Sequence, residues 1–97
     1  MKTPSQMRNL GPVMERFLRE IDVHSAEDLA AMGAVEAWRR IAFIHPRALN
    51  RIGLYAMAGA LLDRDWRDLP PDVKADLDRE AARIRAALKL NRRGTSR

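Results

Sequence analysis

The sequence predicts an all-α protein, a compact bundle of about five to six helices. Alanine, arginine and leucine dominate its 97 residues, and these residue types favour helices. No stretch shows the sustained alternation of β-branched and polar residues that is typical of a strand, whereas apolar residues recur at helical spacing. The length is that of one domain with one small hydrophobic core.

The N-terminal region predicts two helices joined by a tight turn. A short helix, about Pro4 to Asn9, leads into "NLGP", where Gly11 frees the backbone and Pro12 suits the first position of the next helix. That next helix is expected over Pro12 to Ile21. Its apolar residues share one face, and they are Met14, Phe17, Leu18 and Ile21.

The segment "VHSAEDLAAMG" carries the clearest local signal in the chain. Ser25 is placed to cap a helix by accepting a hydrogen bond from the N–H of Asp28, and Gly33 is placed to end that helix. The acidic residues in between suit the positive N-terminal end of the helix dipole. We therefore expect a two-turn helix over Ala26 to Met32.

Three longer helices are expected in the rest of the chain. The first is Val35 to Ile44, because Pro46 disfavours helical geometry at His45, and the other two are Ala48 to Arg64 and Asp72 to Leu90. Between the last two, Trp66 is interpreted as a structural plug. We expect residues 1–90 to form a single domain. Residues 91–97 lack apolar anchors and are expected to form a disordered basic tail.

The middle one of these helices contains "IGLYAMAGALL", which is apolar on all sides. A helix of this kind is usually surrounded by protein. Small residues share one of its faces and allow close approach of a neighbouring backbone; they are Gly53, Ala56 and Ala60. We interpret it first as the central core helix. The alternative is a homodimer interface formed by the same three residues.

Composition narrows the compartment and the class of partner. The chain has no cysteine, no apolar run of about 20 residues and no secretory signal, which favours a cytoplasmic protein without a membrane partner. The net charge is +5. A basic excess attracts polyanions such as DNA, although many arginine-rich bacterial proteins carry the same excess as ordinary solvated surface. The candidate nucleic-acid contacts from charge alone are Arg39, Arg40, Arg47, Arg51, Arg92 and Arg93.

Motifs that carry catalysis or metal binding do not occur. His24 and His45 lie in different connections, and neither has the spacing of a metal-ligand pair. There is no nucleophile elbow, no glycine-rich phosphate loop followed by lysine and no calcium loop. We expect no enzymatic activity, no metal and no cofactor.

The turn "RNLGP" offers a second candidate contact with nucleic acid. The first N–H groups of a helix lack acceptors within the helix and attract phosphate. The layout resembles the helix-hairpin-helix motif, which grips a nucleic-acid backbone, so Arg8, Asn9, Leu10 and Gly11 are candidate contacts. Asn9 stands where that motif usually has its first glycine, and Pro12 has no N–H to donate.

Several separated motifs resemble a specific family. "RNLGPVMERFLREIDVHSAEDLAAMGAVEAWRRI" and then "LNRIGLYAMAGALLDRDWRDLP", over about Met7 to Pro70, are similar to the C-terminal domain of the TfoX (Sxy) competence regulators. The resemblance implies an all-helical domain related to helix-hairpin-helix folds, in proteins that control the transcription of DNA-uptake functions. Two-domain members carry an N-terminal α/β domain, so a stand-alone version is expected here.

Two hypotheses for the function follow. The first is a regulatory module that contacts DNA, or a DNA-bound transcription complex, through the candidate residues above. The alternative is a module for protein–protein interaction or homodimerisation in which the basic residues are ordinary surface. An enzyme would need convergent polar groups in a pocket, and the sequence nominates none.

Overall fold

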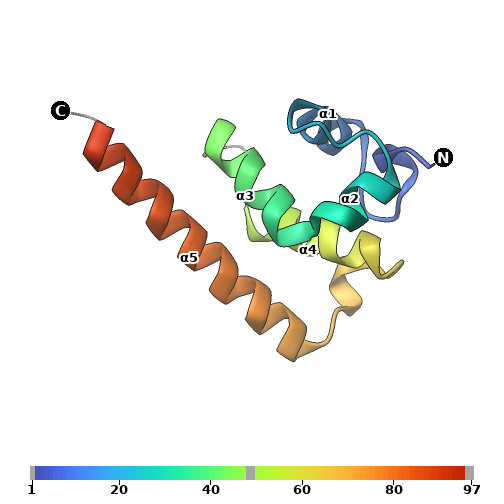
Figure 1. The fold of residues 1–97 in the computed structure, drawn as a ribbon. Helices are drawn as coiled ribbons and strands as arrows, with labels where there is room; N and C mark the ends of the chain where they lie inside the picture. The colour runs from blue at the N-terminus through green and yellow to red at the C-terminus, as the bar shows by residue number, and fades with distance from the viewer. Residues whose placement is uncertain (1, 48–49, 96–97) are drawn as a thin grey trace.

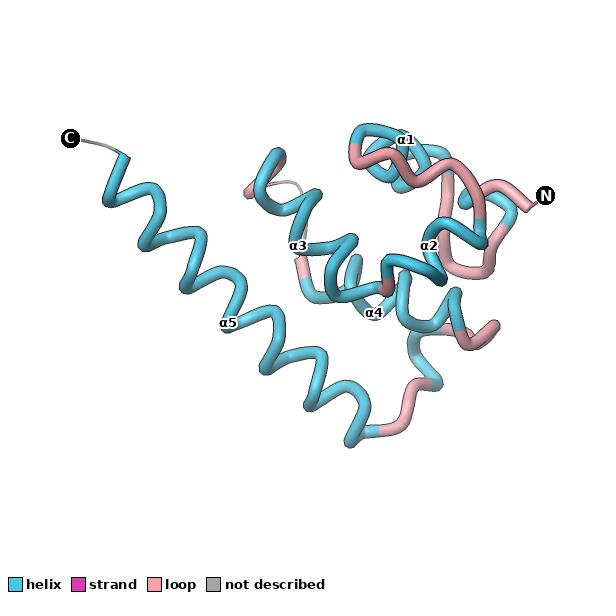
Figure 2. The backbone as a smooth tube through the Cα atoms, viewed as in Figure 1, coloured by secondary structure: helices cyan, strands magenta, loops and turns pink. Residues whose placement is uncertain are grey.

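The computed structural model describes residues 2–47 and 50–95, with side chains up to Lys89, and it confirms the all-α prediction. Figure 2 shows helices joined by short loops, with no strand in the described part of the chain. The elements in chain order are η1 (Pro4–Gln6), α1 (Pro12–Glu20), α2 (Ala26–Met32), α3 (Ala34–Ile44), α4 (Arg51–Leu61), η2 (Trp66–Asp68) and α5 (Pro71–Thr95).

Two of the N-terminal predictions agree closely with the structure, and one element is shorter than expected. The helix expected from Pro12 is α1, which ends one residue early, and α2 has the expected bounds. The N–H of Asp28 donates to Ser25 Oγ at 3.1 Å, as the capping pattern predicts. Gly33 ends α2 with a φ of 88°, a conformation that favours glycine. The helix expected over Pro4 to Asn9 is only the single 3₁₀ turn η1.

Helix α4 begins later and ends earlier than the sequence predicted. The prediction missed the residues that cap this helix. Asn50 is the N-cap, and its Oδ1 accepts a hydrogen bond from the N–H of Gly53 at 3.2 Å. Asp63, with a φ of 53°, leaves the helical conformation just after the last turn. The expected start at Ala48 lies outside the described residues.

Helix α4 is the central element of the core, as the first interpretation held. It packs against α2, α3, α5 and η2, and its Leu54 and Met57 side chains are fully buried. Figure 1 shows α3 and α4 between the N-terminal elements and the long helix α5. Ala56 and Ala60 are buried within this same core. Of the three residues named for the alternative homodimer interface, these two alanines are covered by the chain itself and Gly53 is half-buried.

Helix α5 is longer than expected and reaches beyond the rest of the fold. Leu77, Ala81 and Ile84 pack into the core. The backbone remains helical to Thr95, whereas we expected a disordered tail from residue 91; residues 96–97 lie outside the described part. Figure 1 shows the C-terminal half of α5 extending past the end of α3, on the side of the molecule away from the N-terminus. The molecule measures 44 × 29 × 20 Å as a result.

Candidate functional site

The hairpin turn holds the fold together through the side chain of Asn9. Asn9 Nδ2 donates to the carbonyl oxygens of Arg64 at 2.7 Å and Ala56 at 3.3 Å, and Asn9 Oδ1 accepts from the N–H of Trp66 at 3.3 Å. Asn9 itself has a φ of 72°, in the left-handed region that asparagine tolerates better than most residues. These contacts tie the turn before α1 to the connection between α4 and η2.

A glycine in α4 makes this close approach possible. A Cβ atom added at Gly59 would lie 2.7 Å from Asn9 Nδ2 and 2.8 Å from the carbonyl oxygen of Arg64. Both distances are below van der Waals contact, and the carbonyl belongs to the backbone. Gly59 is therefore required by the packing of the turn against α4.

The other residues of the turn are also used by the fold. Leu10 is buried in the core, and Gly11 is in extended backbone with a φ of −123°, which any residue adopts. Arg8 is exposed and donates from Nη1 to the carbonyl oxygen of Asp63 at 3.1 Å. The turn predicted to hold a phosphate is thus engaged in internal contacts at Arg8, Asn9 and Leu10.

A carboxylate also lies in the first turn of α1. Glu15 Oε1 accepts hydrogen bonds from the N–H and the Oγ of Ser5, at 3.1 and 3.0 Å. The bond from the Ser5 N–H is the main reason that the pKa of Glu15 is lowered. Because this carboxylate is ionised at neutral pH, a phosphate at the start of α1 would meet a like charge.

Arg39 and Arg40 share one acidic partner on their own helix. Arg39 Nη2 lies 2.6 Å from Glu36 Oε2, and Arg40 Nε lies 2.7 Å from the same oxygen. The hydrogen bond from Arg39, followed by that from Arg40, lowers the pKa of Glu36 to about 2. The three side chains together carry one net positive charge instead of two.

We expect this triad to make a small contribution to acid sensitivity. Because the pKa of Glu36 falls on folding from 4.5 to about 2, the ionised carboxylate adds to the free energy of unfolding. This contribution is complete above about pH 4.5 and is lost as the pH falls from there towards 2. The carboxylate is about one-third exposed, so we expect at most about 1 kcal/mol. Urea unfolding at pH 7 and pH 3 should show a smaller acid loss for Glu36→Gln than for the parent; an equal loss contradicts the assignment.

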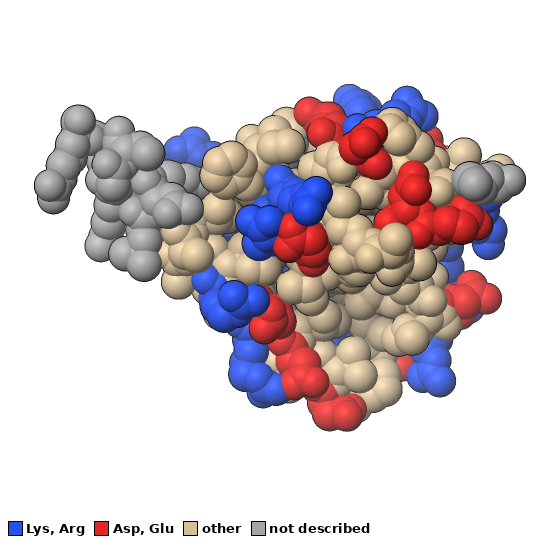
Figure 3. Space-filling view, viewed as in Figure 1, with Lys and Arg blue, Asp and Glu red and all other residues tan. Residues whose placement is uncertain are grey.

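The remaining charge candidates belong to other parts of the chain. Arg51 Nη1 lies 3.8 Å from Asp78 Oδ2, and the same aspartate accepts a hydrogen bond from the hydroxyl of Tyr55. Arg47 is exposed after the end of α3. Arg92 and Arg93 belong to α5, but their side chains lie outside the described part. Figure 3 shows blue and red side chains interleaved on this face of the molecule, without a broad basic patch.

The structure reveals an apolar surface that the sequence analysis missed. Phe43 and Ile44, at the end of α3, are 65% and 46% exposed. On one side of them a hollow of about 480 Å³ is lined by Ile21 of the α1 end and by Arg39 and Arg40. In the sequence, the run "IAFI" at the end of this helix indicates such a surface. A helix that packs on one side leaves some residues of a continuous apolar run exposed to solvent.

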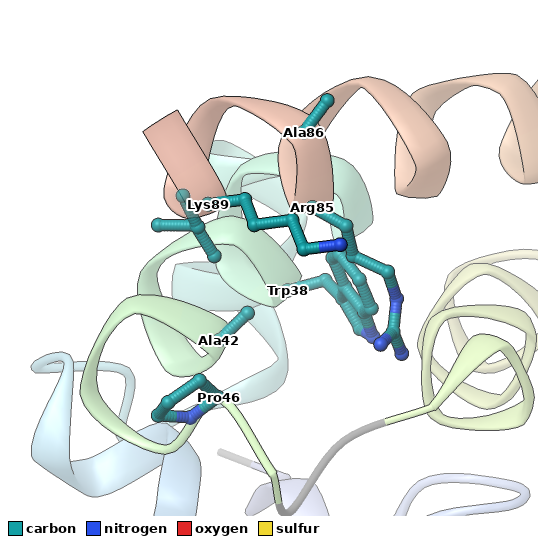
Figure 4. Close-up of a pocket in the computed structure, with 7 residues that line it drawn as sticks. Trp38, Ala42, Pro46, Arg85, Ala86 and Lys89 are labelled. Carbon is teal, nitrogen blue, oxygen red and sulfur yellow. The ribbon is translucent and has the colours of Figure 1, made fainter. Parts of the chain in front are cut away.

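A second hollow lies between α3 and the C-terminal half of α5. It has a volume of about 410 Å³, and its lining residues are Trp38, Ala42, Pro46, Arg85, Ala86, Leu88 and Lys89. Figure 4 shows Trp38 and Arg85 side by side, with Ala42 and Pro46 beneath α5 and Lys89 reaching over the opening. The Arg85 guanidinium carbon lies 5.4 Å from the centre of the Trp38 ring. We call this hollow the α3–α5 groove.

The buried tryptophan fixes the floor of this groove. Trp38 is fully buried, and its Nε1 donates to the carbonyl oxygen of Asn50 at 3.1 Å. That bond joins α3 to the N-cap of α4. The floor of the α3–α5 groove is therefore part of the rigid core, whereas the Lys89 and Ala86 side of it is exposed.

No three His, Asp or Glu side chains among the described residues gather where they could hold a metal ion. None of the helices in residues 2–47 and 50–95 is long and apolar enough to cross a membrane.

Comparison with known proteins identifies the family. A family model described as the TfoX C-terminal domain matches residues 2–81. The chain belongs to the TfoX C-terminal domain family. The matched range includes the hairpin turn, α2, α3 and α4, and the first part of α5, so it contains the segments on which the sequence resemblance was based. It is a family of regulatory type.

A solved structure supports the fold of this TfoX C-terminal domain. The crystal structure of an uncharacterized protein from Listeria monocytogenes, in a triclinic form, superposes with a TM-score of 0.74 at 28% sequence identity. The superposition covers 78% of this chain and 85% of that chain. No curated protein matches the sequence.

Proposed function

We propose that this TfoX C-terminal domain is a non-enzymatic regulatory module that binds a protein of a DNA-bound transcription complex. The observation that carries the proposal is the exposed apolar end of α3, where Phe43 and Ile44 line the hollow shared with Ile21. Large exposed apolar side chains next to a hollow are typical of protein-binding surfaces. The family resemblance adds the context, which is the regulation of competence and DNA uptake.

The contacts of the hairpin turn also favour a protein partner over direct phosphate binding. Asn9 and Leu10 are used by the fold, and Glu15 adds a negative charge near the start of α1. Interfaces with DNA are strongly positive and polar, whereas the end of α3 is apolar. A protein surface with apolar side chains of its own suits this end of the domain better.

Direct DNA binding is the second candidate because of the net charge of +5 and the absence of any acidic residue after position 80. A titration with duplex DNA at ~50 and ~200 mM salt tests it, since several phosphate contacts produce a steep loss of affinity. A variant without the charges of Arg39, Arg40, Arg47 and Arg51 belongs beside it. Absence of binding at the lower salt rules this candidate out.

Site-specific photo-crosslinking in the source cell tests the protein-binding proposal. The photoreactive residue p-benzoylphenylalanine is placed at position 43 in one variant and at position 13 in the control. Val13 is 58% exposed on α1, so both positions tolerate a large aromatic residue. We expect a discrete adduct from position 43 and none of that mass from position 13. The same adducts from both positions, or none from position 43, contradict the proposal.

A further inference from the structure

We infer that the α3–α5 groove binds an acidic amphipathic helix of another protein. This inference rests on the proposed protein-binding function and specifies the chemistry of the partner. Such a helix lays apolar side chains at i, i+3 or i+4, and i+7 into a groove and leaves its charged flanks at the rim.

The shape and lining of the groove fit apolar anchor side chains. Its volume of about 410 Å³ lies in the range of about 300–1,000 Å³ that binding pockets occupy. Half-buried Pro46 and Leu88 and exposed Ala86 present apolar surface to the groove, above the buried Trp38 and Ala42 of α3. Exposed Phe43 and Ile44, at the same end of α3, line the hollow on its other side. A partner helix would bury several anchors there.

The charge around this surface selects acidic flanks. Arg85 and Lys89 line the groove on the α5 side. Arg39 and Arg40 line the hollow on the far side of α3, where they and their shared partner Glu36 together carry one net positive charge. The acidic residue beside that hollow, Glu20, already accepts a hydrogen bond from His45 Nε2 at 2.9 Å. A partner with carboxylates on both sides of its apolar stripe therefore complements the rim, and a basic helix is repelled.

A second copy of this chain suits the groove less well because most of its carboxylates are already engaged. Carboxylates that accept hydrogen bonds or form ion pairs within the chain belong to Glu15, Glu20, Asp22, Asp28, Glu36, Asp65, Asp76, Asp78 and Glu80. On α5, Asp76 pairs with Arg79 and Glu80 pairs with Arg83, each one turn away. A homodimer would break such pairs to supply acidic flanks.

Three synthetic, fluorescein-labelled helical peptides test the inference by fluorescence anisotropy. The acidic peptide has leucines at i, i+4, i+7 and i+11 with glutamates on both flanks. The basic peptide has the same leucines with lysines, and the polar peptide has the same glutamates with serines in place of leucines. We expect the acidic peptide to bind at least about tenfold more tightly than either of the others.

Two pairs of matched variants locate the binding site. Ala86→Glu places a negative charge at the groove, and Ala87→Glu makes the same change at the next residue of α5, which is also exposed but does not line the groove. Lys89→Glu reverses a charge at the rim of the groove. Its control, Lys2→Glu, makes the same charge reversal near the N-terminus, which Figure 1 shows on the opposite side of the molecule. We expect affinity to fall about tenfold for Ala86→Glu and about fivefold for Lys89→Glu, with no change for the two controls.

The possible outcomes separate this inference from the function on which it rests. Equal binding of the acidic and basic peptides, no binding of the acidic peptide, or equal loss in the control variants overturns the inference. Photo-crosslinking of a protein at position 43 would still support the proposed function in those cases. A dimer in sedimentation that Ala86→Glu dissociates and Ala87→Glu preserves also overturns the inference, because the occupant would then be a second copy.

Discussion

Replacing Trp38 with alanine is expected to lower the free energy of unfolding by about 3–5 kcal/mol, the usual cost of removing a large buried aromatic side chain. Trp38 is fully buried between α3 and α5. The change leaves a cavity under Arg85 and leaves the carbonyl oxygen of Asn50 without its donor. Urea unfolding followed by far-ultraviolet circular dichroism measures the loss.

Two further variants separate packing from hydrogen bonding at this site. Trp38→Phe keeps most of the apolar contact and removes the Nε1 donor, so we expect a smaller loss than for Trp38→Ala. Trp66→Ala alters the other tryptophan, which is half-buried in η2, and its cost should also be smaller. A cost below about 1 kcal/mol for Trp38→Ala would show that the core does not depend on this residue.

Replacing Asn9 with alanine is expected to lower the free energy of unfolding by about 2.5–5.5 kcal/mol. The variant loses three hydrogen bonds to backbone groups of Ala56, Arg64 and Trp66, each worth about 0.5–1.5 kcal/mol. It also places alanine at a φ of 72°, which costs about 1 kcal/mol more than for asparagine or glycine. Chemical denaturation of the variant and the parent provides the comparison.

Asn9→Gly distinguishes the two causes, because glycine tolerates the left-handed backbone and lacks the side-chain hydrogen bonds. We expect its stability to lie between that of Asn9→Ala and that of the parent. The DNA titration of Asn9→Ala gives a second readout. If this variant is as stable as the parent and has lost affinity for DNA, the turn is a phosphate site and its structural role is contradicted.

Helix ends that are set by residues close together in the sequence were predictable. The bounds of α2 followed from Ser25 and Gly33, and the start of α1 followed from Pro12, because a cap and its helix lie within a few residues of each other. The central place of α4 followed from its apolar composition. Its shorter length was missed because the capping role of Asn50 depends on one side-chain oxygen reaching Gly53.

The role of the hairpin turn was not predictable in this way. "NLGP" has the composition of a phosphate-binding turn, and its structural role comes from the contact of Asn9 with residues about 50 positions later in the chain. The requirement for Gly59 has the same origin, since only the packed turn leaves no room for a Cβ atom. Sequence pattern does not contain such long-range partners.

The α3–α5 groove was missed for a related reason. Trp38 and Ala42 lie in the helix predicted over Val35 to Ile44, and α5 corresponds to the helix predicted over Asp72 to Leu90. Whether two such helices close against each other along their whole length depends on their relative orientation, which the spacing of apolar residues does not specify.

Arg39 and Arg40 were candidate DNA contacts because of their charge alone. In the structure both side chains pair with Glu36.

The chemical nature of the adduct formed from position 43 tests the central claim most directly. After photo-crosslinking of the variant with p-benzoylphenylalanine at this position, one half of the sample is treated with nuclease and the other half is digested with protease. We expect an adduct that nuclease leaves intact and whose tryptic peptides come from a second protein, with no counterpart from position 13. An adduct that nuclease shortens, with no second protein in it, would contradict a protein-binding role for the end of α3.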